Sequence, residues 1–243
     1  MEVEFMIRLD KFLSEMGVGT RQEVKHYIRK GKVEVDGEIE KRPELKVDET
    51  KANVTLDGER IGYASYVYYM LNKPSGVVSA TEDKREKTVI DLITGQKRKD
   101  LFPVGRLDKD TVGLLLITND GNLAHRLLSP KHHVDKCYFA KVQGNVTKDD
   151  AEKFAEGVNI GTEDEPEITM PGKLDIIKSD DLSEIRLTIQ EGKFHQVKRM
   201  FQAVGKEVVY LKRERMGSLN LDYNLAEGEY RMLTEEELKN LLF

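Results

Sequence analysis

The chain is organised around one stretch, which reads Gly105-Arg106-Leu107-Asp108-Lys109-Asp110-Thr111-Val112-Gly113-Leu114-Leu115-Leu116-Ile117-Thr118-Asn119-Asp120-Gly121. Its second half contains a short unbroken apolar run, Leu114 to Ile117, as expected of a strand that is buried on both faces. The Asn119-Asp120-Gly121 sequence that follows is typical of a turn. Its first half carries four charged residues just before the strand: Arg106, Asp108, Lys109 and Asp110. A carboxylate held beside a rigid strand, with cations near it, is suited to act on a substrate.

Composition describes a foldable chain that needs no membrane. The 243 residues are 39% hydrophobic and 34% charged, which suits one large domain or two modest ones and excludes a disordered chain. No apolar run approaches the ~20 residues that a membrane span needs. The single cysteine, Cys137, excludes an internal disulfide and a cysteine-based metal cage. We therefore expect a cytoplasmic protein without a membrane partner.

Residues 8–62 are predicted to form a small separate module. Apolar residues at helical spacing and a following Gly17 predict a first helix, with Leu9, Phe12, Leu13 and Met16 inward. Thr20 and Glu23 have the spacing of a capping box, which predicts a second helix. Two hairpins should follow, each with an Asp-Gly turn, at Asp36-Gly37 and at Asp57-Gly58.

The exposed face of the second helix is basic. Arg21, Lys25 and Arg29 fall four residues apart, and Lys30 and Lys32 lie just beyond. The net charge of −5 is unfavourable for a nucleic-acid ligand, although a basic footprint can be local. From spacing alone, a solvated helix face explains these residues equally well.

Two phrases of this module resemble the S4 RNA-binding domain. They are Arg8-Leu9-Asp10-Lys11-Phe12-Leu13 and Gly31-Lys32-Val33-x-Val35-Asp36-Gly37. The resemblance favours phosphate contact over a merely solvated face. It predicts RNA contacts from six residues: Lys11, Arg21, Lys25, Arg29, Lys30 and Lys32.

The remainder of the chain predicts alternating strands and helices after a Gly62–Ser65 linker. We expect strands at residues 66–71, 114–117, 138–142, 174–177, 185–189 and 208–211. Helices are expected after Gly121, at residues 148–157 and 197–204, and after Thr234, where Glu237 completes a capping box. The basic residues Lys212, Arg213 and Arg215 should follow the last of these strands. The adjacent His132 and His133 predict no metal site, because neighbouring side chains on a loop rarely reach one ion and no third ligand has a usual spacing.

Three separated phrases resemble the bacterial ribosomal-RNA pseudouridine synthases of the RsuA/RluB/RluE/RluF family. The first is Leu71-Asn72-Lys73-Pro74-x-Gly76, and the second is the central Gly105–Gly121 stretch. The third is Gly192-Lys193-x-x-Gln196-Val197-Lys198-Arg199-Met200. From spacing alone Asp108 is an ordinary turn or cap residue. The resemblance instead implies that it is the catalytic residue.

The same resemblance assigns the supporting residues. Lys136-x-Tyr138 matches the family phrase that carries the active-site tyrosine, and Lys198 matches the basic residue that pairs with the catalytic Asp. Arg106 and Leu107 flank the site. Three residues of the third phrase are expected to bind RNA: His195, Gln196 and Arg199. Cys137 stands where a threonine is expected, which affects no catalytic assignment.

The resemblance also implies a substrate. The Ser129-Pro130-x-His132-His133 phrase and the terminal Gly228–Glu237 phrase are closest to the small-subunit member of the family, which implies conversion of a 16S uridine, the U516 site, to pseudouridine. The expected partner is ribosomal RNA, within a small-subunit assembly particle, and we expect a monomer that uses no cofactor and no metal. A 23S target and a catalytically silent S4-type assembly protein remain alternatives. A fragment of an S4-linked aminoacyl-tRNA synthetase is disfavoured, since the chain lacks His-x-Gly-His and Lys-Met-Ser-Lys-Ser phrases.

The expected fold class is α+β. We predict an S4 module at residues 7–62, a hinge at residues 62–65, and a catalytic domain at residues 66–243 built on a mainly antiparallel sheet, with Asp108 in its central cleft.

Overall fold

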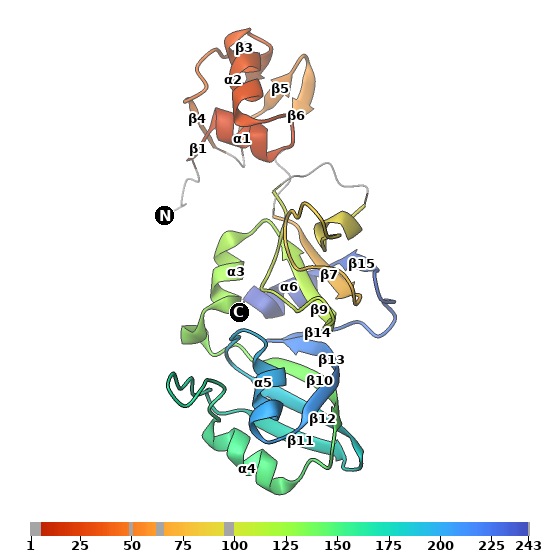
Figure 1. Ribbon diagram of the computed structural model, residues 1–243. Coiled ribbons are helices and arrows are strands. Elements are labelled where there is room, and N and C mark those ends of the chain that lie inside the picture. The colour runs from red at the N-terminus through yellow and green to blue at the C-terminus, as the bar shows by residue number, and fades with distance from the viewer. Residues whose placement is uncertain (1–5, 49–50, 62–65, 95–99, 243) are drawn as a thin grey trace. The chain divides into compact units, whose positions relative to one another are not determined.

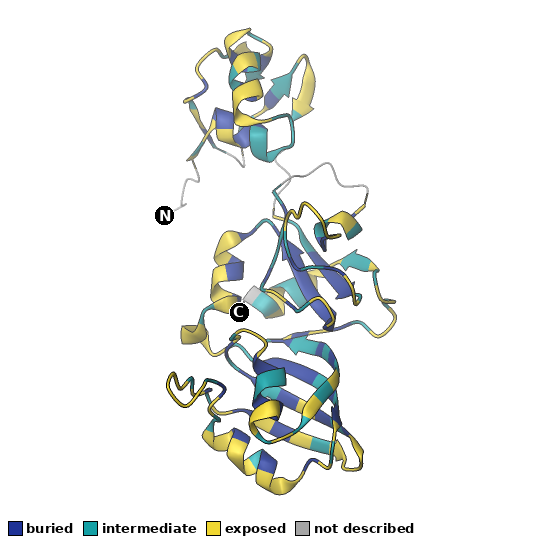
Figure 2. Ribbon diagram, viewed as in Figure 1, coloured by how far each residue is buried: buried dark blue, intermediate teal, exposed yellow. Residues whose placement is uncertain are grey.

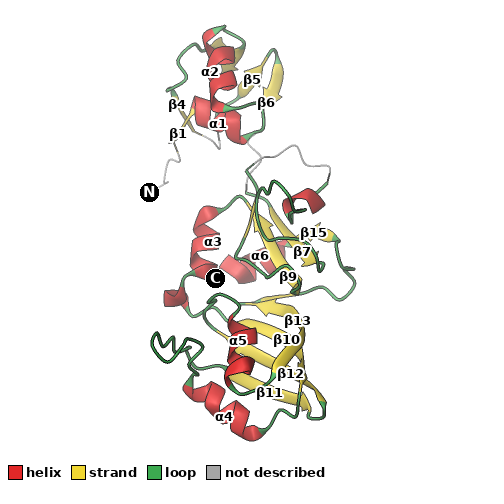
Figure 3. Ribbon diagram, in the orientation of Figure 1, coloured by secondary structure: helices red, strands yellow, loops and turns green. Residues whose placement is uncertain are grey.

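The protein forms two compact units (Figures 1 and 3). The computed structural model describes residues 6–48, 51–61, 66–94 and 100–242. The N-terminal unit contains the described residues up to Val67 together with Thr94, Asp100 and Leu101. The second unit contains Tyr68–Ile93 and the described residues from Phe102 onward. The predicted hinge at residues 62–65 lies outside the described residues.

The N-terminal unit begins with the two predicted helices. They are α1 (Leu9–Glu15) and α2 (Arg21–Arg29). The capping box is formed, because the Glu23 amide donates to Thr20 Oγ1 at 3.3 Å and the Thr20 amide donates to Glu23 Oε2 at 2.7 Å. The helix prediction for this unit is therefore confirmed, down to the residue that starts α2.

A four-stranded antiparallel sheet completes this unit. Its order is β3 (Glu38–Ile39), β2 (Val33–Val35), β5 (Val54–Leu56) and β6 (Glu59–Ile61), so both Asp-Gly turns connect hairpins as predicted. A separate pair joins β1 (Met6–Arg8) to β4 (Lys46–Asp48). The shared core is built from the buried residues Leu9, Phe12, Leu13, Val24, Ile28, Val33, Val47 and Val54.

A nine-stranded sheet is the frame of the second unit. Its main order is β11 (Lys173–Lys178), β12 (Leu182–Ile189), β10 (Lys136–Gln143), β13 (Glu207–Met216), β9 (Val112–Thr118), β7 (Tyr68–Lys73) and β15 (Tyr230–Met232). Two short strands are attached, β14 (Leu219–Asn220) to β13 and β8 (Phe102–Pro103) to β9. The pairs are antiparallel except β13 with β9, which is parallel. The predicted α+β class with a mainly antiparallel sheet is confirmed.

Strand β9 is an interior strand of this sheet, between β13 and β7, and every residue of it is buried (Figure 2). Its close approach to β13 depends on Gly113, whose φ is +98°. A Cβ at this position would lie 2.4 Å from the carbonyl oxygen of Arg213, so only glycine fits the parallel pairing.

Helices cover the sheet and close the core. They are α3 (Gly121–Leu128), α4 (Lys148–Glu156), α5 (Gln196–Ala203) and α6 (Glu235–Leu242), with short 3₁₀ turns η1 (Ile90–Leu92) and η2 (Pro130–His132). The apolar face of α5 is buried. The Phe201 ring packs edge-on against the ring of Phe154 in α4, with ring centroids 5.0 Å apart. None of the helices that the structure describes is long and apolar enough to cross a membrane.

Strand β13 is longer than predicted. It continues to Met216, so Lys212, Arg213 and Arg215 lie within it and not after it. Arg213 is buried, and its Nε donates to the carbonyl of Leu114 at 2.8 Å. A run of charged residues indicates a loop in sequence, but here the strand buries one arginine by pairing it with a backbone carbonyl of β9.

Candidate active site

The loop between β8 and β9 carries Asp108, and its backbone is fixed from neighbouring segments. Ser79 Oγ donates to the Leu107 carbonyl at 2.8 Å and accepts from the Leu107 amide at 3.0 Å. The Thr111 amide donates to the Asp108 carbonyl at 3.1 Å, which closes a tight turn before β9. Asp108 therefore projects from a backbone that is held on both sides.

Lys73, at the end of β7, also fixes the backbone of this loop through hydrogen bonds. Its side chain is fully buried, and Nζ donates to the carbonyls of Pro74, Lys109 and Thr111 at 3.1, 3.2 and 2.8 Å. Burial lowers the pKa of Lys73 to about 8, although the carboxylates of Asp110 and Asp108 oppose the shift. In the sequence Lys73 is only one member of the Leu71–Gly76 phrase, with no role of its own. Its position at the end of an apolar strand is the signal that could have identified it.

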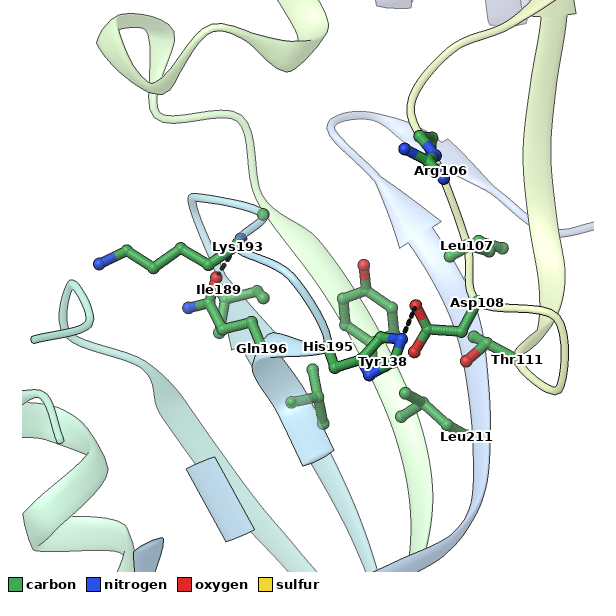
Figure 4. Close-up of a pocket in the computed structure, with 12 residues that line it drawn as sticks. Arg106, Leu107, Asp108, Thr111, Tyr138, Ile189, Lys193, His195, Gln196 and Leu211 are labelled. Atoms are coloured by element: carbon green, nitrogen blue, oxygen red, sulfur yellow. Dashed lines mark hydrogen bonds and ion pairs between the residues drawn. The ribbon is translucent and has the colours of Figure 1, made fainter. Parts of the chain in front are cut away.

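Lys198 and His195 flank the Asp108 carboxylate. Lys198 Nζ lies 3.3 Å from Oδ2, and His195 Nε2 lies 3.5 Å from Oδ1. Figure 4 shows the Asp108 and His195 side chains turned toward one another, from the loop and from the start of α5. The predicted proximity of Lys198 and Asp108 is thus present, across 90 residues of sequence.

Lys198 is shared with a second carboxylate. Its Nζ donates to Asp110 Oδ1 at 2.6 Å and to Oδ2 at 2.8 Å, both shorter than the contact with Asp108. The hydrogen bond from Lys198 lowers the pKa of Asp110. In the sequence Asp110 is only one of the charged residues before the strand, because nothing in the spacing indicates which carboxylate faces the lysine.

A pocket opens beside Asp108. It is lined by residues from the loop, from β10 and from the start of α5, among them Arg106, Leu107, Asp108, Thr111, Tyr138, His195 and Gln196. Tyr138 is nearly buried, with 8% of its surface exposed. Thr111 Oγ1 is buried and has no hydrogen-bond partner among the residues that the structure describes. The pocket therefore combines one carboxylate and an aromatic ring, with the Thr111 hydroxyl buried in its wall.

The segment Glu191–Gln196 is held by buried polar contacts. Gln196 Nε2 donates to Glu191 Oε1 at 2.8 Å, and the Lys193 amide donates to Gln196 Oε1 at 2.8 Å. Gln196 was expected to bind RNA, but its side chain is buried and both of its polar atoms are engaged within the protein. In this structure the side chain shapes the turn that presents His195, which lies in the left-handed region at φ 48°.

Arg199 was also expected to bind RNA. Its guanidinium donates to the carbonyls of Ile160 and Phe194 and to Glu167, at distances from 2.6 to 3.0 Å. These contacts tie α5 to the acidic loop at residues 159–172, to which sequence reasoning assigned no task. Because most of its donors are engaged, Arg199 serves as a support in this structure.

The basic residues of the N-terminal unit are exposed or half-buried, as predicted, but they differ in their partners. Lys25 and Arg21 lie 3.7 and 3.8 Å from the buried carboxylate of Asp10, which Arg8 also binds. Lys11 pairs with Glu15, and Lys32 pairs with Asp57. Among the described residues, no ion pair engages Arg29 or Lys30. These two cations are the ones most available to a phosphate.

Metal binding finds no support in the described part of the chain. Within it, no three His, Cys, Asp or Glu side chains are grouped so that they could hold an ion.

Comparison with known proteins identifies the family. The model of the RNA pseudouridylate synthase family matches residues 67–203, and the S4 domain model matches residues 7–53. The chain belongs to the RNA pseudouridylate synthase family. It is thus a pseudouridine synthase, an isomerase, with an S4 domain at its N-terminal end.

Relatives that align with nearly the whole chain support the same family. The chain is 50% identical to an uncharacterised RNA pseudouridine synthase, YtzG, of Bacillus subtilis (strain 168), over 96% of this chain and 97% of that one. It is 42% identical to ribosomal small subunit pseudouridine synthase A of Escherichia coli (strain K12), over 97% and 100%. A crystal structure of a pseudouridylate synthase aligns with a TM-score of 0.67 at 39% identity, over 97% of this chain and 99% of that one.

Proposed function

We propose that this synthase isomerises one uridine of small-subunit ribosomal RNA, the U516 site, with Asp108 as its catalytic residue. The observation that carries the proposal is the position of Asp108 in the pocket, between Lys198 and His195 and beside Tyr138. The target follows from relatives named ribosomal small subunit pseudouridine synthase A that match nearly the whole chain at 42–43% identity.

The reaction breaks the N1–C1′ bond of uridine, turns the uracil and joins C5 to C1′. The proton that leaves C5 is balanced by one gained at N1, so no atom is added or lost and no cofactor is required. The base must first leave its stack, at a cost of a few kcal/mol. Stacking on an aromatic ring returns about 1–3 kcal/mol per base, which is the role we assign to Tyr138.

Asp108 must be ionised whether it adds to C1′, adds to C6 or removes the C2′ proton. Cations within about 4–6 Å favour the ionised form of a carboxylate in a closed site. The ammonium group of Lys198 lies within that range, 3.3 Å from Asp108 Oδ2. Among the described residues that line the pocket, Asp108 is the one carboxylate. Ordinary glycoside hydrolysis normally pairs two carboxyl groups, so the site favours isomerisation over hydrolysis.

We further propose that the S4 unit contacts RNA phosphates through Arg29 and Lys30, and that Arg106 contacts RNA backbone beside the pocket. Arg106 is exposed and makes no side-chain ion pair or hydrogen bond with the described residues. We place the substrate in a small-subunit assembly particle in the cytoplasm, and expect the enzyme to act as a monomer.

The test is pseudouridine mapping by carbodiimide labelling and primer extension across both ribosomal RNAs. Cells that lack the gene would be complemented with the wild-type protein or with Asp108→Ala. We expect one small-subunit stop that the wild type restores and Asp108→Ala does not, with turnover of the purified variant reduced about a thousandfold or more. A restored large-subunit stop would move the target to 23S RNA, and full activity of Asp108→Ala would remove Asp108 from the mechanism.

A further inference from the structure

Phe194 is an exposed aromatic residue beside the pocket. Its surface is 74% exposed, and its ring stacks on that of His195 with centroids 3.7 Å apart and planes inclined by 22°. His195 in turn lies 3.5 Å from the Asp108 carboxylate. One face of the Phe194 ring is therefore covered by a residue of the site, which leaves the ring anchored and available on its other side.

The turn that presents this pair is rigid. Lys193 Nζ donates to the Ile168 carbonyl at 2.6 Å, and Arg199 Nη1 donates to the Phe194 carbonyl at 3.0 Å. The buried contacts between Glu191 and Gln196 hold the turn from inside. An aromatic ring on a fixed turn loses little conformational entropy when it binds a ligand.

A second hollow adjoins the pocket at this ring. It encloses about 460 Å³, whereas the pocket beside Asp108 encloses about 70 Å³. Both cavities share Arg106, Asp108 and His195, and Phe194 lines only the larger one. A substrate that places its reacting base at Asp108 can therefore extend into the larger hollow.

The charges of the hollow suit a polyanion with flat bases. Arg106, Lys109 and Lys193 line it. Lys109 pairs with Glu86 and Lys193 with Glu167, whereas Arg106 forms no ion pair with the described residues. The carboxylate of Asp83 lines it too, but its Oδ1 accepts from the amides of Arg85 and Glu86. Aromatic rings interleaved with cations bind single-stranded nucleic acid by stacking and by phosphate contact.

We propose that the stacked rings of Phe194 and His195 form a platform for the base adjacent to the target uridine. The proposal rests on the proposed function and extends it to a second nucleotide. When the target base leaves the stack, its neighbour loses a stacking partner. The exposed face of Phe194 replaces that partner, and Arg106 binds the phosphate between the two nucleotides.

The test compares Phe194→Leu with Phe194→Trp on a small-subunit RNA transcript that contains the mapped target. Leucine removes the ring but keeps an apolar side chain, and we expect it to weaken RNA affinity and raise KM about 10- to 100-fold. At saturating RNA kcat should change less than about threefold. Phe194→Trp should restore affinity. The control is Tyr223→Leu, which removes a ring that is 81% exposed and lies outside the hollow.

A direct readout uses 2-aminopurine at the position 5′ or 3′ of the target uridine. In the wild-type complex we expect low emission at one of these positions, and higher emission with Phe194→Leu. Equal affinity and equal emission for the wild type and Phe194→Leu would overturn the platform. A loss of kcat at unchanged affinity would also overturn it, because the ring would then act only through His195 and Asp108. Absence of pseudouridine with the wild type would instead refute the proposed function.

Discussion

Lys198 is held between two carboxylates, Asp108 at 3.3 Å and Asp110 at 2.6 and 2.8 Å. The two short contacts determine where the ammonium group lies. We infer that Asp110 positions the ammonium group that lies beside Asp108, although Asp110 itself does not line the pocket. The Asp110 side chain is 70% exposed, so its ion pair with Lys198 contributes little to the free energy of unfolding. We infer that the pair instead fixes the position of the Lys198 ammonium group.

We predict that Asp110→Asn lowers kcat about tenfold with little change in RNA affinity. The amide keeps the shape of the side chain but no longer attracts the lysine, whose position beside Asp108 is then less defined. Single-turnover kinetics at saturating RNA, together with a binding titration, would measure this.

The control is Glu86→Gln, which removes the exposed contact with Lys109 of the same loop. Equal losses in both variants would show that Asp110 supports only the loop. Since Lys198 lowers the pKa of Asp110, this carboxylate stays ionised at neutral pH, and the effect should be the same from about pH 6 to 8.

The loop at residues 105–111 depends on two neighbouring elements. Lys73 at the end of β7 binds three of the surrounding carbonyls, and Ser79 binds both backbone groups of Leu107. A loop built in this way presents Asp108 with little freedom, which suits a residue that must meet one atom of a displaced base.

We predict that, because Lys73 is buried, the free energy of unfolding changes with pH in the alkaline range. Its folded-state pKa of about 8 lies below the value of about 10.4 in an unfolded chain. Between these values the unfolded chain holds the proton more tightly, so the free energy of unfolding rises with pH across this window. Relative to Lys73→Met, the wild type should gain about 2 kcal/mol between pH 8 and pH 10.

Urea unfolding of both proteins across that range measures the difference. Burial also lowers the pKa of Lys136. Because Lys136 is present in both proteins, its contribution cancels in the comparison. If the free energies of unfolding of the wild type and Lys73→Met changed with pH in parallel, Lys73 would keep its ordinary pKa in the folded protein.

The whole molecule carries a net charge of −5 and nevertheless belongs to an RNA-modifying family. Many of its cations are paired within the protein, as Lys206 is with Asp150 and Lys109 with Glu86. RNA binding must then depend on the few cations that remain available. In the N-terminal unit these include Arg29 and Lys30.

We predict that the double variant Arg29→Gln with Lys30→Gln weakens RNA binding and makes its salt dependence shallower by about 1.5 in the log–log slope. The matched control is Lys148→Gln with Lys153→Gln on α4, which changes the net charge equally. Titrations at several salt concentrations would show the difference, and an equal effect of both double variants would mean that only total charge matters.

The sequence by itself determined the local elements and the family. The capping box at Thr20, the Asp-Gly hairpins and the apolar β9 are set by contacts between residues close in the chain, and these appear where they were predicted. The motifs around Asp108 and Lys198 identified the family without any coordinates. The extent of β13 was missed, because its pairing with β9 and β10 overrides a locally charged sequence.

Tertiary structure alone decided which side chains meet. Gln196 and Arg199 occur in a basic motif that indicates RNA contact, yet the fold engages both with Glu191, Ile160 and Glu167. Asp110 and Lys198 lie 88 residues apart, and only the packing of α5 beside the loop brings them into contact. Such partners are set by distances between elements, and periodicity and local propensity carry no information about those distances.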